Sequence, residues 1–148
     1  MTYEKQTWVD LREGNTPIVA ARLNHMEDGI EAASFNYRRS LDYSIGTTLT
    51  EEADVFRWYN LSGQTLTIDR VWASFAAAST ATFDINVNGT TIFSSTKLVL
   101  SAVTNAVKLP ASFAITTIAN GSYITIDVDS VSGSPEYGIV SIDLSGNA

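Results

Sequence analysis

Residues 83–94 read FDINVNGTTIFS, and this stretch predicts an antiparallel β-hairpin. Phe83, Ile85 and Val87 alternate with polar residues, which gives an extended segment one apolar face and one polar face. The Asn88-Gly89 pair that follows is the strongest short-range hairpin signal, because both residues adopt the left-handed conformation of a two-residue turn at low cost. We therefore expect a strand, a tight turn and a returning strand here.

The same alternation recurs along the rest of the chain after residue 41. It is clear in residues 124–129 and 140–145, and shorter strands are expected at 55–61, 66–75, 97–100 and 112–118. Turn signals separate these segments, at Gly46, Gly63, Gly89, Gly121 and Gly133. Connections this short leave no room for crossover helices, so the pairing should be antiparallel. Residues 41–148 thus predict an antiparallel β-sandwich, jelly-roll-like, of seven or eight strands.

Residues 16–39 carry a helical pattern instead. Apolar residues recur at alternating intervals of four and three, which is the spacing of a coiled-coil seam; they are Val19, Leu23, Met26, Ile30, Ala33 and Tyr37. Thr16 and Pro17 suit the N-cap and the first helical position. A lone helix of this length is marginal in water, so its narrow stripe needs a partner, either its own β-domain or other copies. We favour self-association, with residues 1–40 as an assembly arm and helix and residues 41–148 as the sandwich domain.

The composition excludes several classes of function. A formal charge of −7 and a pI near 4.5 argue against nucleic acid, whose binding depends on Lys and Arg. The absence of cysteine excludes disulfides and thiolate metal sites. No apolar stretch reaches the length of about 18 residues that suggests a membrane span, and residues 1–10 lack a signal-peptide pattern. We expect no membrane insertion, no signal peptide and synthesis in a cytoplasm.

Few residues suit catalysis. His25 is the single histidine, so no second imidazole is present to build a zinc site or a Ser-His pair with a spare base. We interpret it as a surface residue, with a pH-sensitive subunit contact as the alternative. Aspartates occupy the predicted polar strand faces, at Asp84, Asp127, Asp129 and Asp143. A solvated face is the preferred interpretation; glycosidase-type acid–base work and a calcium site at Asp127 and Asp129 are the alternatives. We predict no enzyme, no metal and no cofactor.

Several aromatic residues are of the type that stacks on sugar rings. Alternation in residues 55–60 places Phe56 and Trp58 on one face and Arg57 and Tyr59 on the other. The candidates for a saccharide contact are Trp58, Tyr59, Trp72, Tyr123 and Tyr137. Packing in the core or between subunits is the preferred interpretation of these residues.

The N-terminal sequence carries a recognisable motif. Residues 6–10, 16–18 and 21–30 read QTWVD, TPI and ARLNHMEDGI. They resemble the motif TWVD…TPI…A.RLN.ME.GI of structural proteins from phages that infect Gram-positive bacteria, over residues 6–33. Residues 68–75, 83–93 and 121–131 resemble, more loosely, a phage virion β-sandwich domain. Where that pattern has Val-Gly, this chain has Val131-Ser132-Gly133, which shifts the turn by one residue.

The resemblance implies a virion structural protein: a head or tail fibre, spike or baseplate component. It also implies a homotrimer, a choice between two and three strands that the seam itself leaves open. The expected partners are copies of the chain, other virion proteins and host cell-wall saccharide, and the expected location is the virion. The alternative is a carbohydrate-binding β-sandwich module without a primary assembly role.

Overall fold

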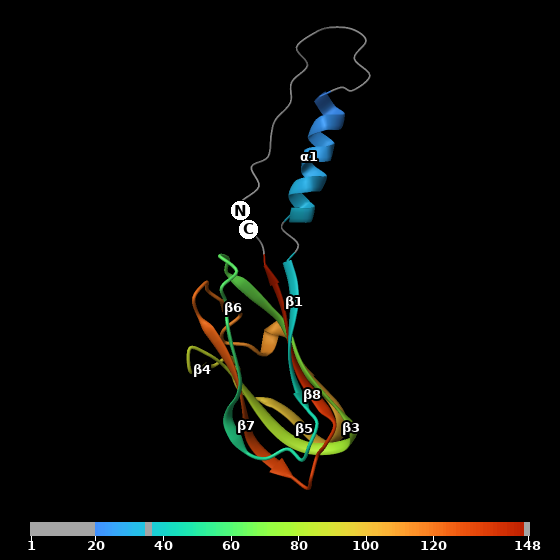
Figure 1. Cartoon of the computed structure of the whole chain (residues 1–148), viewed down its shortest axis with the longest axis vertical. Coiled ribbons are helices and arrows are strands. Elements are labelled where there is room, and N and C mark those ends of the chain that lie inside the picture. Colours follow the sequence, from blue (N-terminus) through green and yellow to red (C-terminus); the bar gives the residue numbers. More distant parts are fainter. Residues whose placement is uncertain (1–19, 35–36, 147–148) are drawn as a thin grey trace.

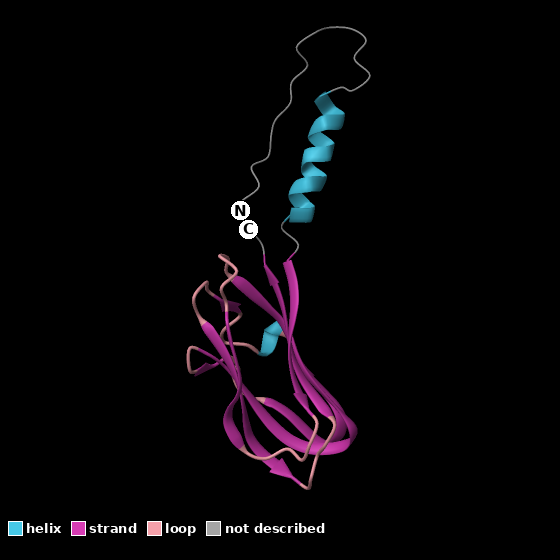
Figure 2. Cartoon of the chain, in the orientation of Figure 1, coloured by secondary structure: helices cyan, strands magenta, loops and turns pink. Residues whose placement is uncertain are grey.

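The computed structural model describes residues 20–34 and 37–146, which form one α-helix and one curled antiparallel sheet (Figure 1 and Figure 2). Helix α1 spans Ala20–Ser34. The eight strands are β1 (Tyr37–Ile45), β2 (Glu52–Tyr59), β3 (Leu66–Val87), β4 (Thr90–Thr91), β5 (Leu98–Lys108), β6 (Thr117–Ile118), β7 (Tyr123–Ser132) and β8 (Gly138–Gly146), with a short 3-10 helix at Pro110–Ser112. The predicted mainly β, sandwich-like architecture with a preceding helix is confirmed.

Strand β3 organises the sheet because it is 22 residues long and bends between its two halves. Ser74 lies opposite both Ile139 of β8 and Asn105 of β5. Thr82 lies opposite both Ser130 of β7 and Val99 of β5. Strands β8 and β7 therefore follow one another along one edge of β3, while β5 occupies the other edge. The sheet divides into a first wing (β1, β8 and the first half of β3) and a second wing (β2, β7 and the second half of β3).

The core lies between the two wings and is built from alternate strand residues. Phe83 and Ile85 of β3 and Ile124 and Ile126 of β7 are fully buried, as are the matching aliphatic residues of β8. Burying one such side chain contributes roughly 1.5–3 kcal/mol. The polar residues that alternate with them point to the outer faces of the wings.

The predicted hairpin after β3 is confirmed. Asn88 and Gly89 have φ values of 51° and 80°, the left-handed pair that a tight turn needs, and the chain returns as β4. The predicted turn glycines Gly63, Gly121 and Gly133 also have positive φ. Of these turns, the one at Asn88-Gly89 joins two strands that pair with each other, β3 and β4. Within the described chain, the turns at Gly63, Gly121 and Gly133 connect strands that pair with other partners.

The predicted extent of the helix was wrong at its C-terminal end. Helix α1 ends at Ser34, and Tyr37, Arg38 and Arg39 lie in β1. Residues 37–45 pair with residues 146–138 of β8 without interruption, so the bonds of a complete strand pair replaced the last helical turns. Tyr37 is consequently no seam residue, and the expected boundary between residues 40 and 41 falls inside β1.

Candidate functional site

Two aspartates of the second wing share one lysine. Asp84 accepts a hydrogen bond from Thr91 Oγ1 at 2.5 Å, and its other oxygen lies 2.8 Å from Lys97 Nζ. Lys97 also reaches Asp129 Oδ2 at 2.6 Å. The hydrogen bond to Asp129, followed by the one to Asp84, raises the pKa of Lys97 above its ordinary value. The lysine thus neutralises two carboxylates on the outer face, one of which, Asp84, is buried.

Asp127 shapes the edge of the same wing. Its two carboxylate oxygens accept hydrogen bonds from the backbone N–H of Asp54, at 2.7 Å, and from Asn86 Nδ2, at 2.8 Å. Asp54 has a φ of 55° and lies where β2 bulges away from β7. Asp127 therefore fixes a bulge. Within residues 20–34 and 37–146, no three acidic or histidine side chains are grouped so that they could hold a metal ion.

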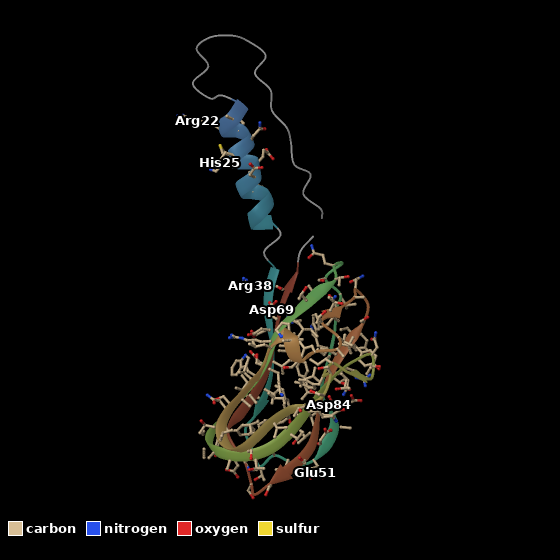
Figure 3. The ribbon with its side chains drawn as sticks, turned by 180° about the vertical axis from the view of Figure 1, so that it is seen from behind. Arg22, His25, Arg38, Glu51, Asp69 and Asp84 are labelled. Atoms are coloured by element: carbon tan, nitrogen blue, oxygen red, sulfur yellow. The ribbon has the colours of Figure 1, made fainter. Side chains whose placement is uncertain are left out.

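Asp143 lies on the other wing, away from these aspartates. Ser40 of β1 donates to its Oδ1 at 2.5 Å, and Arg70 of β3 forms an ion pair with its Oδ2. Burial raises the pKa of the Asp143 carboxyl, but the hydrogen bonds from Ser40 and Arg70 outweigh burial and hold the pKa below its ordinary value. The four predicted aspartates therefore occupy two separate surfaces (Figure 3 labels Asp84), and each accepts hydrogen bonds from other groups.

Two of the predicted saccharide-contact residues meet on the outer face of the second wing. The rings of Tyr59 and Tyr123, which are opposite each other in β2 and β7, lie 5.6 Å apart at an angle of 51°. The Arg57 guanidinium lies 4.7 Å from the Tyr123 ring centre, within cation–π range. The backbone N–H of Tyr123 donates to Asn88 Oδ1 at 3.0 Å. We call Arg57, Tyr59 and Tyr123 the tyrosine surface. It is an aromatic patch with a polar border, and Tyr59 is 47% exposed.

Trp58 and Tyr137 lie elsewhere. Trp58 points inward from β2 and packs against the core, with the Arg39 guanidinium 5.0 Å from its ring centre. Strand alternation predicts that Trp58 and Tyr59 lie on opposite faces of β2, and in the structure Tyr59 is the exposed one. Tyr137 is exposed in the turn between β7 and β8, at the opposite end of β7 from Tyr123, and has a φ of 53°. Neither residue shares a surface with the tyrosine pair.

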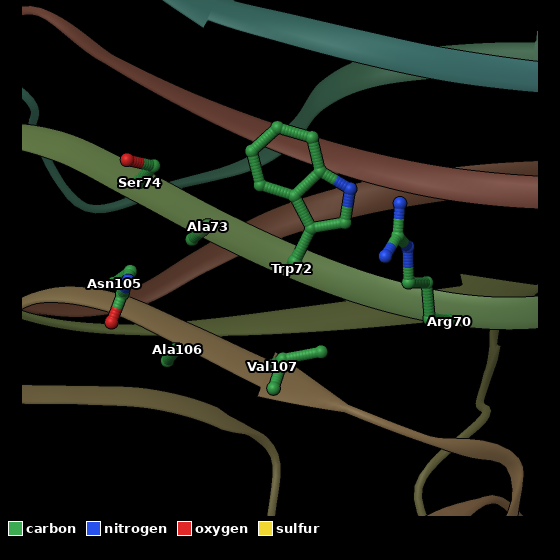
Figure 4. A pocket seen from close by; sticks show the side chains of 7 residues that line it. All are labelled: Arg70, Trp72, Ala73, Ser74, Asn105, Ala106 and Val107. Atoms are coloured by element: carbon green, nitrogen blue, oxygen red, sulfur yellow. The ribbon is translucent and has the colours of Figure 1, made fainter.

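Trp72 lines an open groove on the outer face of the first wing (Figure 4). The groove has a volume of about 560 Å³ and is lined by Arg70, Trp72, Ala73, Ser74, Asn105, Ala106 and Val107. Trp72 lies opposite Val107 of β5, and its indole nitrogen is on the Arg70 side of the ring. That nitrogen is buried and makes no hydrogen bond of normal geometry within the described chain. The groove thus combines one indole with a small number of polar groups.

Sequence reasoning missed the groove residues Arg70, Asn105 and Val107. It placed a strand only at 97–100, whereas β5 continues to Lys108. The even spacing of Val99, Val103 and Val107 was a usable signal for one long strand. The register shift between Ile68 and Arg70, by contrast, is a bulge that no local sequence pattern indicated.

The helix exposes part of the predicted seam. Met26 and Ile30 are exposed and Leu23 is half-buried, while His25 is exposed beside them (Figure 3). Val19 and the side chain of Ala33 lie outside the described residues. Helix α1 is too short and too polar to cross a membrane, and the described residues contain no other candidate span.

Comparison with known proteins adds little. No family model matches the chain, and no curated protein matches it significantly. Among solved structures, it is similar to the catalytic unit of a thermostable GH87 α-1,3-glucanase from Streptomyces thermodiastaticus, with 15% identity and a TM-score of 0.31. The match covers 76% of this chain but only 20% of the glucanase chain. A similarity at this level does not bear on function.

Proposed function

We propose that this chain is a structural protein of a bacteriophage virion, a fibre, spike or baseplate component that assembles as a homotrimer through its N-terminal helix. The observation that carries the proposal is the exposure of the seam: Met26 is 60% exposed and Ile30 is 45% exposed. Apolar residues at this spacing on a helix are normally covered by another element or another chain. The phage motif of residues 6–33 supports the same assignment.

Solution mass tests the assembly step. We expect light scattering to give about three chains for the full-length protein and one chain for a version that begins at Tyr37, the first residue of β1. Leu23→Asp and Ile30→Asp should each reduce the mass, because a buried charge opposes the seam. Ala21→Asp, which places the same charge at an exposed position outside the seam, is the matched control. A monomeric full-length protein contradicts the proposal.

The tyrosine surface favours a second candidate function, a saccharide contact on the host cell envelope. An exposed Tyr59, a neighbouring Tyr123 and the Arg57 guanidinium supply a stacking face and hydrogen-bond donors, the groups that recognise sugars. Calorimetric titration with host cell-wall polysaccharide should show binding that Tyr59→Ala abolishes. Leu61→Ala, an exposed apolar residue two positions further along, should leave the binding unchanged. No binding by the wild type excludes this candidate.

We further infer that the polar strand faces carry no hydrolytic activity. The carboxylates of Asp84, Asp127 and Asp143 each accept two interactions from side chains or backbone. A general acid needs a carboxyl that is free to reach its substrate. Polysaccharide hydrolysis by the wild type that falls in Asp84→Asn, Asp127→Asn or Asp143→Asn would contradict this inference.

A further inference from the structure

Exposed apolar side chains gather along strand β5. Val99, Val103 and Val107 are 40%, 41% and 56% exposed, and Leu109, directly after the strand, is 55% exposed. We call these four residues the β5 strip. Scattered exposed valines are ordinary on a protein surface. Here three in β5 and a leucine directly after it form a row of exposed apolar residues, with the polar Ser101 and Asn105 between them.

The strip also runs along a sheet edge that carries little charge. Strand β5 pairs only with β3, so within the described chain its other edge has no partner strand. Natural edge strands are usually protected by charged side chains. Here β1 carries Arg38, Arg39 and Asp42, and β2 carries Glu52, Asp54 and Arg57, whereas residues 98–107 contain no charge. Of the three long edge strands, β5 carries the fewest charged residues, with Lys108 at its end as the single one.

The groove lined by Trp72 lies directly beside the β5 strip. Val107 belongs to both features, and Trp72 lies opposite it on β3. A recess of about 560 Å³ beside protruding apolar side chains is a surface that a neighbouring protein can fill. Interface cores are enriched in aromatic residues and arginine, and the groove contributes Trp72 and Arg70.

We infer that the β5 strip docks against the sandwich of a second copy of this chain. The inference rests on the proposed helical assembly. Only residues 35 and 36 separate α1 from β1, so associated helices hold neighbouring sandwiches at a high effective concentration. The net charge of the chain also favours a second copy as the partner at this surface. Copies with a formal charge of −7 repel one another, and they approach most readily through an uncharged surface such as residues 98–107.

Spin labelling tests whether the strip is covered. The chain has no cysteine, so a single nitroxide can be attached to the full-length protein at Ser101→Cys, an exposed position between Val99 and Val103. Ser44→Cys, an exposed serine on edge strand β1, is the matched control. We expect the label at 101 to be immobilised in the oligomer and mobile after Leu23→Asp dissociates it. The label at 44 should be mobile in both.

Charge substitution supplies an independent measurement. Val103→Lys combined with Val107→Lys should raise the dissociation constant of the full-length oligomer about tenfold or more, because two lysines would have to be desolvated in the contact. Leu61→Lys, at an exposed apolar position outside the strip, should leave it unchanged.

The outcomes separate this inference from the proposed function. A mass of three chains with an equally mobile label at 101 in oligomer and monomer keeps the helical assembly and overturns the strip contact. A second outcome is an oligomer that survives Leu23→Asp, dissociates in the Val103→Lys and Val107→Lys variant, and immobilises the label at 101. That outcome supports the strip contact and shows that the helix is not the assembly element. A monomer at every concentration overturns both.

Discussion

Asn60 is the buried polar residue with the most structural consequences. Its Nδ2 donates to the carbonyl oxygens of Gln64, at 2.7 Å, and Ile118, at 2.8 Å, and its Oδ1 accepts from Ser62. One amide therefore joins the turn after β2 to strand β6. Asn60→Ala leaves these buried groups unpaired and should lower the free energy of unfolding by about 2–4 kcal/mol, measured by denaturant titration.

Asn105→Ala is the control for this prediction. Asn105 is exposed at the groove, so its loss should change stability by less than about 0.5 kcal/mol. Equal effects of the two substitutions would show that the Asn60 hydrogen bonds do not stabilise the turn.

Asp143 gives stability a specific pH dependence. Its pKa is lower in the folded protein than its ordinary value of 3.8, so its interactions stabilise the fold above that value. The contribution is lost as pH falls through the lower folded pKa, where both states are protonated. The stability difference between wild type and Asp143→Asn should therefore be largest near neutral pH and shrink below about pH 4, in denaturant titrations at several pH values.

Arg70→Gln checks the cause of this dependence, because Arg70 is one of the donors that lower the pKa of Asp143. Arg70→Gln should reduce the loss of unfolding free energy that occurs as pH falls from neutral to below about pH 4. A difference between wild type and Asp143→Asn that stays constant from neutral to acid pH contradicts the assignment.

At the scale of elements, the start of β1 decides which fragment folds well. Arg39 lies over the Trp58 ring of the second wing, and Ser40 donates a hydrogen bond to Asp143 of the first wing. The first four residues of β1 therefore contact both wings. A fragment of residues 41–148 should unfold about 2 kcal/mol more easily than one of residues 37–148, by thermal or chemical denaturation. Equal stability of the two fragments would mean that this end of β1 is only loosely attached.

The same strand shows where sequence reasoning stops. The three-four spacing of apolar residues predicted a helix through Tyr37, because local spacing contains no information about a partner strand. Pairing with β8 turned Tyr37 into the first residue of β1. For β3, residues 76–79 interrupt the strand pattern, so two strands were expected. The structure joins them, because β5 bonds to β3 on both sides of the bend.

The candidate site was also predictable only as far as local sequence determines it. Alternation correctly placed Tyr59 and Trp58 on opposite faces of the strand, since that depends only on neighbouring residues, but it did not indicate which of the two is exposed. The meeting of Tyr59 and Tyr123 depends on the register between β2 and β7. That register is set by the whole sheet, including the bulge at Asp54, and no local pattern encodes it.

At the scale of the whole molecule, salt distinguishes an apolar interface from an ionic one. The chain carries a formal charge of −7, whereas the four side chains of the β5 strip carry none. Screening weakens repulsion between acidic copies and leaves apolar contacts intact. Raising salt from about 20 mM to about 500 mM should therefore lower the dissociation constant of the oligomer, measured by sedimentation equilibrium. Dissociation that increases with salt would place ion pairs, rather than the helix seam and the β5 strip, at the contacts between copies.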